Sequence, residues 1–125
     1  MIRGGCICGA VRVAAPLPLD PPMACHCVQC RKGSGHFNVS TAVPREAAEI
    51  VGPVQWYAYK PGVRRGFCPT CGAQVAWDNE TSDKVWIDMG LLEGPTGTRL
   101  SRHLYVSEKG DYYRLDDGLP REETE

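Results

Sequence analysis

The stretch Ala24-Cys25-His26-Cys27-Val28-Gln29-Cys30-Arg31-Lys32 holds three cysteines spaced C-x-C-x-x-C, with two basic residues directly after them. A structural zinc site normally has four protein ligands, whereas a catalytic zinc site keeps one position open for water or substrate. Side chains two positions apart on an extended chain point the same way, so Cys25 and Cys27 face together and His26 faces away. Cys30 returns through a helical or looped turn. The three thiolates therefore predict a metal centre with one vacant position.

The other four cysteines form a second set of metal ligands. Cys6 and Cys8 make a C-x-C near the start of the chain, and Cys68 and Cys71 make a C-x-x-C. We expect Cys6 and Cys8 to lie on one side of an extended segment, and Cys68 and Cys71 to converge through a tight turn. Four thiolates suit a closed, structural zinc site that contributes directly to folding. A redox-active C-x-x-C is the alternative, but the βαβ pattern of thioredoxin-like proteins is missing.

Length and composition fit one soluble zinc-binding domain over residues 1–125, with 42% hydrophobic and 23% charged residues. Seven cysteines are an odd number, which argues against a simple disulfide framework. Free or zinc-bound thiols in this number suit a reducing compartment, so we expect a cytoplasmic location. The N-terminus lacks the apolar region of a signal peptide, and no apolar run is long enough to span a membrane. The formal net charge of −1 gives no general attraction to nucleic acid. The sequence leaves open whether the chain forms an oligomer.

Short alternating segments between glycine and proline turns predict a mainly β fold with little helix. We expect strands over residues 9–14, 36–43, 54–59, 73–77, 84–89 and 100–106, the last continuing into 110–113. Residues 44–49 are the best helical candidate, because a proline stands near the start and good helix formers follow. Residues 33–35 are expected to form a flexible turn. The expected architecture is a set of folded antiparallel sheets, like a β-sandwich, cross-linked by zinc.

Basic residues beside the cysteines are candidates for binding a substrate. Arg31 and Lys32 follow the three-cysteine segment, and Arg64 and Arg65 precede Cys68. Such cations bind carboxylates, with arginine favoured for bidentate contacts. We take Arg31, Lys32 and Arg65 as the candidate substrate contacts. The alternative is that these residues are solvated surface charges.

Two histidines bear on whether the three-cysteine site is open. If His36, His103 or another side chain supplied a fourth ligand, the site would be closed and the chain would be a non-catalytic, zinc-stabilised binding module. His103 lies within an expected strand, where it is either a proton donor or acceptor or a structural histidine with satisfied hydrogen bonds.

Three motifs resemble those of the glutathione-dependent formaldehyde-activating family, which also includes centromere protein V. They are Gly5-Cys6-Ile7-Cys8-Gly9-Ala10-Val11, Cys25-His26-Cys27-Val28-Gln29-Cys30-Arg31-Lys32 and Arg65-Gly66-Phe67-Cys68-Pro69-Thr70-Cys71-Gly72. His103 and the run Asp117-Gly118-Leu119-Pro120 resemble the closing motif of that family.

The resemblance implies a mainly β fold with a structural and a catalytic zinc site. It assigns the structural ligands to Cys6, Cys8, Cys68 and Cys71, and the catalytic ligands to Cys25, Cys27 and Cys30. It further implies a zinc-dependent carbon–sulfur lyase acting on thiol–aldehyde adducts, as in the formation of S-hydroxymethylglutathione. The expected partners are a small-molecule thiol, with glutathione favoured, and a carbonyl substrate, of which formaldehyde is one candidate.

Overall fold

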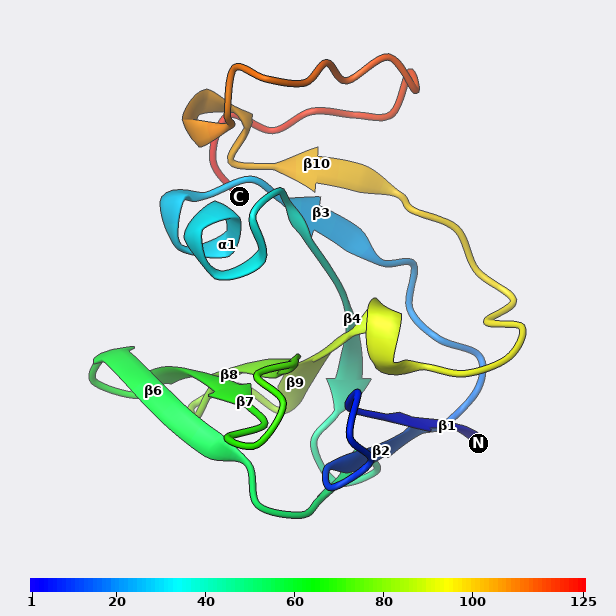
Figure 1. The fold of residues 1–125 in the computed structure, drawn as a ribbon. Helices are drawn as coiled ribbons and strands as arrows, with labels where there is room; N and C mark the ends of the chain where they lie inside the picture. Colours follow the sequence, from blue (N-terminus) through cyan, green and yellow to red (C-terminus); the bar gives the residue numbers. More distant parts are fainter.

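A computed structural model, which describes residues 1–125, confirms the mainly β fold (Figure 1). The strands are β1 (Ile2–Gly5), β2 (Arg12–Ala15), β3 (Met23–Cys25), β4 (Asn38–Pro44), β5 (Glu49–Val51), β6 (Gln55–Lys60), β7 (Val63–Phe67), β8 (Gln74–Asn79), β9 (Lys84–Asp88) and β10 (Arg102–Leu104). A smaller sheet has the order β1-β2-β5, and a larger one the order β10-β3-β4-β9-β8-β7-β6. The paired strands are antiparallel except β10 and β3, which are parallel.

The helical segments are α1 (Val28–Ser34) and two short 3-10 helices, η1 (Met89–Leu91) and η2 (Val106–Glu108). The prediction of a helix over residues 44–49 is wrong, because the chain makes a turn after β4 and its end pairs with β2 as β5. The expected flexible turn at residues 33–35 is wrong in part, because α1 runs to Ser34 and only Gly35, with φ 82°, is left-handed. Residues 110–113 form no strand. Helix α1 is stabilised at its start by the Sγ of Cys27, which accepts from the Cys30 amide at 3.4 Å.

The hydrophobic core lies between the two sheets, as in a sandwich. Ile2, Val13 and Ala15 come from the smaller sheet, and Val43, Val75, Val85 and Ile87 from the larger one. Gly4 explains how closely β1 approaches η1, since a Cβ there would lie 1.8 Å from the carbonyl oxygen of Leu91. Gly4 also bridges to Leu92. This close approach fixes the position of the first cysteine pair, which follows β1 directly.

The opposite face of the larger sheet carries the side chains from which the site is built. Residues directly opposite in a ladder share a face, as do residues two apart in a strand. Cys25 therefore shares a face with Asp88, through the pairs Met23–Ser40 and Ser40–Asp88. The pairs Trp86–Trp77 and Trp77–Arg65 extend that face to β7. We call it the site face, defined by Met23, Cys25, Asp88, Trp86, Trp77 and Arg65.

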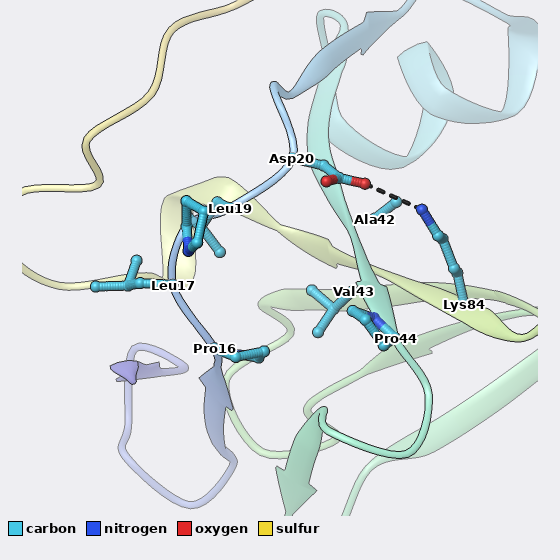
Figure 2. A pocket seen from close by; sticks show the side chains of 9 residues that line it. Pro16, Leu17, Leu19, Asp20, Ala42, Val43, Pro44 and Lys84 are labelled. Carbon is cyan, nitrogen blue, oxygen red and sulfur yellow. Dashed lines mark hydrogen bonds and ion pairs between the residues drawn. The ribbon is translucent and has the colours of Figure 1, made fainter.

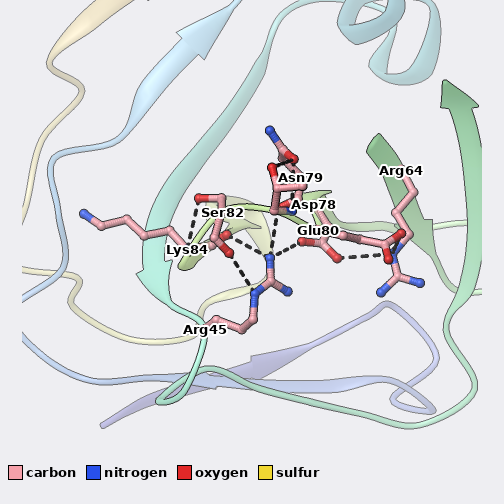
Figure 3. Close-up of polar contacts among 8 residues, drawn as sticks. Arg45, Arg64, Asp78, Asn79, Glu80, Ser82 and Lys84 are labelled. Atoms are coloured by element: carbon pink, nitrogen blue, oxygen red, sulfur yellow. Dashed lines mark hydrogen bonds and ion pairs between the residues drawn. The ribbon is translucent and has the colours of Figure 1, made fainter. Parts of the chain in front are cut away.

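Arg64 and Arg65 are neighbours on β7, but only Arg64 binds the buried carboxylate of Asp78. Asp78 is only 1% exposed, and it binds Arg45 at 2.6 Å and Arg64 at 3.1 Å (Figure 3). Arg64 also lies over the ring of Trp56, at 4.0 Å from the centroid. Because side chains alternate along β7, Arg64 is held on the core side, and Arg65 is directed to the site face. Arg64 is therefore a structural residue rather than the substrate contact that its position beside Arg65 suggested.

We expect replacement of Asp78 by alanine to lower the free energy of unfolding by about 1–3 kcal/mol, because two guanidinium groups lose a buried acceptor. The loss stays moderate because the side chains of Arg45 and Arg64 are 39% and 32% exposed and regain water. Urea denaturation of the metal-loaded protein measures the change. Glu80→Ala is the matched control, since Glu80 is 52% exposed and lies 3.5 Å from Arg64. Equal effects of the two substitutions would contradict the role given to Asp78.

Candidate metal centre

The first cluster brings together four cysteines from two turns that are far apart in the chain. The Sγ atoms of Cys6, Cys8, Cys68 and Cys71 all lie within 4.8 Å of one another. Four sulfurs placed tetrahedrally at about 2.3 Å from Zn²⁺ would be about 3.8 Å apart. The separations of 3.6 Å for Cys6–Cys8 and 3.8 Å for Cys8–Cys68 match this value. The donor set and its spacing therefore fit a closed, tetrahedral zinc site.

The two turns have similar backbone hydrogen bonds. Cys6 N donates to Val11 O and Cys68 N donates to Ala73 O, each at 3.0 Å. A left-handed glycine follows the second cysteine of each pair, with φ 82° at Gly9 and 79° at Gly72. The expectation of an extended segment through Cys6 and Cys8 is therefore wrong. The pair lies in the turn between β1 and β2, and the turn, not strand alternation, brings the sulfurs together.

Backbone amides in these turns favour the thiolate form of the ligands. The Val11 amide donates to Cys6 Sγ at 3.2 Å, which is the largest cause of the lowered pKa of Cys6. Amide hydrogen bonds from Ala73 and then from Cys8 lower the pKa of Cys71 to about 6. Amides aimed at sulfur are what a site for a cation bound by thiolates requires, because they stabilise negative charge on the ligands.

The second cluster gathers Cys25, Cys27 and Cys30, whose Sγ atoms also lie within 4.8 Å of one another. Cys25 ends β3, Cys27 precedes the first turn of α1, and Cys30 lies within that turn. Because the three thiols lie so close together, their pKa values shift in different directions. Hydrogen bonds from Cys25 and then Cys30 lower the pKa of Cys27 to about 2, whereas those with Cys27 and Cys30 raise the pKa of Cys25. The donor set fits a soft cation such as Zn²⁺.

Arg65 reaches this cluster from β7, and one of its terminal nitrogens lies 3.0 Å from Cys30 Sγ. Desolvation opposes the charge of the guanidinium, but the attraction and hydrogen bond of Cys30, together with the attraction of Cys27 and Tyr59, raise the pKa of Arg65. Its Nε is buried and has no hydrogen-bond partner. The guanidinium therefore places a fixed positive charge, with a free donor, beside the three thiols.

The other two candidate substrate contacts lie on α1. Arg31 is half-buried and its Nε also lacks a hydrogen-bond partner, whereas Lys32 is exposed.

We expect Arg65→Met to weaken metal binding at the three-cysteine cluster by about tenfold or more, as loss of a hydrogen-bonded neighbour of a metal ligand commonly does. Zn²⁺ with three thiolates carries a net charge of −1, which the guanidinium stabilises. Titration with Co²⁺, followed by its thiolate absorption bands, measures the affinity of each site. The four-cysteine site serves as the internal control and should keep its affinity. An unchanged titration at both sites would contradict this role for Arg65.

No fourth ligand joins the three cysteines, since no further Cys, His, Asp or Glu ligand atom belongs to the group. His103 lies instead in a buried hydrogen-bonded row. Its Nδ1 pairs with His26 Nε2 at 2.9 Å, and its Nε2 with Asp117 Oδ2 at 2.8 Å. Tyr113 Oη completes the row at 2.5 Å from His26 Nδ1. His36 packs against Phe37. The fourth-ligand role considered for His103 and His36 is therefore not supported.

The row of polar groups fixes the segment that carries the cysteines. His26 is fully buried, and its amide donates to Leu104 O at 2.9 Å. Burial and then the neighbouring His103 lower the pKa of His26 to about 4, so the ring is held neutral. The expectation that His26 turns away from Cys25 and Cys27 is confirmed. The pairing of His26 with His103 was not predicted, because 77 positions separate them and the sequence carries no local signal for it.

A buried acid lies on the site face, on β9, two strands away from the strand that carries Cys25. Asp88 is 8% exposed, and Asn38 Nδ2, opposite Cys25 in the ladder, donates to its Oδ1 at 3.1 Å. Burial raises the pKa of Asp88, against the opposing effects of Asn38 and Arg65. Asp88 was also missed from the sequence, where it looked like an ordinary end of an alternating strand. A buried acid of raised pKa on the same face as a cluster of metal ligands is a candidate for proton transfer.

Comparisons with known proteins agree with this geometry. The family model described as glutathione-dependent formaldehyde-activating enzyme matches residues 1–108. The chain belongs to this family. The matched region thus covers both cysteine clusters, and residues beyond it supply Tyr113 and Asp117. No helix of this family member has the length and apolar character needed to cross a membrane.

A solved structure with the same fold was also found. It is the crystal structure of a Rhodobacter sphaeroides protein, a target of Northeast Structural Genomics. It is similar with a TM-score of 0.64 and 19% sequence identity, over 79% of this chain and 99% of the other. At this identity the likeness shows the fold alone. The search among curated proteins gave no significant match.

Proposed function

We propose that the chain is a zinc-dependent carbon–sulfur lyase that forms and cleaves thiol–aldehyde adducts, with glutathione as the thiol. The observation that carries the proposal is the three-cysteine cluster with Arg65 beside Cys30 and no fourth side-chain ligand. The family supports a glutathione-dependent, formaldehyde-activating type of function. Formaldehyde is therefore the first aldehyde to test.

In the forward reaction the thiol loses its proton and the sulfur electron pair attacks the carbonyl carbon. The carbon–sulfur bond forms as the π pair moves onto oxygen, which takes up a proton; the reverse reaction breaks the same bond. Zn²⁺, when bound by Cys25, Cys27 and Cys30, would supply a soft Lewis acid with a vacant position where a substrate thiol ionises near neutral pH.

The protein's own groups have separate tasks in this scheme. Arg65 would stabilise the negative charge gathered at the cluster, with Arg31 and Lys32 as further contacts for the carboxylates of glutathione. Asp88 is the group that we assign to hold and return the proton, because it shares the site face with Cys25 and burial raises the pKa of its carboxyl group. Trp77 and Trp86 pack edge to face on the site face, with their ring centroids 5.2 Å apart. They form an apolar wall that limits the access of water to the site.

Exchange NMR on ¹³C-formaldehyde and glutathione tests the activity, because it measures adduct formation and breakdown at equilibrium. We expect the zinc-loaded protein to speed the exchange above the rate in buffer. X-ray absorption with and without glutathione should show an additional sulfur ligand at one zinc. No acceleration with several thiols and aldehydes, together with no new sulfur ligand, would leave a zinc-stabilised binding module as the function.

A further inference from the structure

The site face holds a pocket of ≈ 440 Å³ that extends from the edge strand β10 across β3 and β4 to β9. Met23, Trp86, Arg102, Lys84 and Asp20 are among the residues that line it. Met23 stands two residues before Cys25 on β3, so the two side chains share the site face. With a rise of about 3.3 Å per residue, the pocket begins about 7 Å from the three-cysteine cluster.

The pocket has one cation without an acidic partner. Lys84 Nζ binds Asp20 at 3.1 Å, and Figure 2 shows this ion pair at the border with a smaller pocket of ≈ 140 Å³. Arg102 forms no ion pair, and its Nε donates only to the weak acceptor Met23 Sδ at 3.1 Å. The terminal nitrogens of Arg102 are therefore available, and the pocket carries a net positive charge.

The remaining surface of the pocket suits a short organic chain. Trp86 is half-buried and is held edge to face against Trp77. Trp77 in turn donates from Nε1 to Tyr59 Oη at 2.7 Å. The indole of Trp86 is thus fixed in place, and it offers a rigid apolar wall on the β9 side of the pocket, across β3 and β4 from Arg102. A carboxylate at one end of a ligand and an apolar or peptide-like stretch before it match this layout.

We propose that this pocket binds a carboxylate-bearing arm of the substrate thiol, with Arg102 as the residue that recognises the carboxylate. The inference rests on the proposed function, because it places the thiol sulfur at the three-cysteine cluster. A gap of about 7 Å corresponds to about two residues of extended chain. A tripeptide thiol such as glutathione spans this gap, whereas a small neutral thiol such as 2-mercaptoethanol does not. Arg102 therefore sets the preference for an anionic, peptide-sized thiol.

Binding of S-methylglutathione to the zinc-loaded protein tests the pocket without catalysis, because the methylated sulfur cannot ionise while both carboxylates remain. Calorimetry should show binding that Arg102→Ala weakens by about three- to tenfold, as expected for an exposed charge-assisted contact. Arg99→Ala, at an exposed arginine three residues earlier, is the matched control and should bind as the wild type does. The diethyl ester of S-methylglutathione should bind more weakly, and Arg102→Ala should weaken it no further.

Kinetics separate this inference from the proposed function. Arg102→Ala should raise KM for glutathione by a similar factor, while kcat and the reaction of 2-mercaptoethanol stay unchanged. Binding of S-methylglutathione that depends on Arg102, without any catalysis by the wild type, would support the pocket and overturn the lyase. Catalysis by the wild type that Arg102→Ala leaves unchanged would overturn the pocket, as would absence of S-methylglutathione binding or equal binding of the ester.

Discussion

Substitution of Cys68 by serine is expected to unfold the chain. Cys68 is fully buried in the core, and its sulfur lies 3.8 Å from that of Cys8, which is 60 positions away. The smaller and larger sheets share no strand pairing, so a metal at the four-cysteine site would be a strong link between them. Structural zinc contributes about 10–16 kcal/mol in small zinc-binding peptides. A domain with an ordinary free energy of unfolding, about 5–15 kcal/mol, would unfold if it lost much of this zinc-binding energy.

Circular dichroism and proton–nitrogen correlation spectra measure the outcome. We expect Cys68→Ser to lack a cooperative thermal transition and to show the narrow amide dispersion of an unfolded chain. A strong zinc chelator should do the same to the wild type. Thr70→Ala is the matched control, since Thr70 is exposed within the same turn and offers no thiolate. A well-folded Cys68→Ser protein, with a Tm close to that of the wild type, would show that the four-cysteine site is not structural.

The metal clusters could be predicted from the sequence because their ligands come in close pairs and triplets. Within each motif the spacing limits where the sulfurs can point, so only the meeting of Cys6 and Cys8 with Cys68 and Cys71 needed a long-range inference. The assignment of all seven cysteines to sets of four and three agrees with the clusters in the structure. The local backbone conformation around the cysteines was less predictable. Strand alternation suggested an extended segment at Cys6, where a left-handed Gly9 closes a turn instead.

The position of the helix, and the positions of the buried polar residues Asp88 and His103, depend on long-range contacts that cannot be read from the sequence. Residues 44–49 have good helix propensity, but Arg45 is bound by Asp78, and Glu49 pairs with Ala14 in a ladder. Tertiary contacts thus override a weak local preference. Helix α1 has no apolar periodicity and is instead fixed by its cap at Cys27. The positions of Asp88 and His103 relative to the cysteines depend on strand register, which alternation alone does not determine.

Substitution of Cys27 by serine is expected to have the opposite outcome from Cys68→Ser, since the chain should remain folded and lose activity. Cys27 caps α1 by accepting from the Cys30 amide, and a serine oxygen caps a helix start as well or better. The polar row through His26 does not involve the Cys27 side chain. A neutral hydroxyl, however, is a poor replacement for a thiolate ligand to Zn²⁺.

We expect the zinc content of Cys27→Ser to fall from two ions per chain to one, in line with the two clusters. Exchange between formaldehyde and its glutathione adduct should fall by at least about 100-fold, to the rate in buffer. Elemental analysis and exchange NMR measure the two quantities on the same sample, and a Tm within a few degrees of the wild type shows that the fold is kept. Gln29→Ala, an exposed substitution on the same helix, is the matched control. If Cys27→Ser kept its exchange rate after losing one zinc, the three-cysteine cluster would not be the catalytic centre, because the reaction would then need neither that ligand nor the metal bound there.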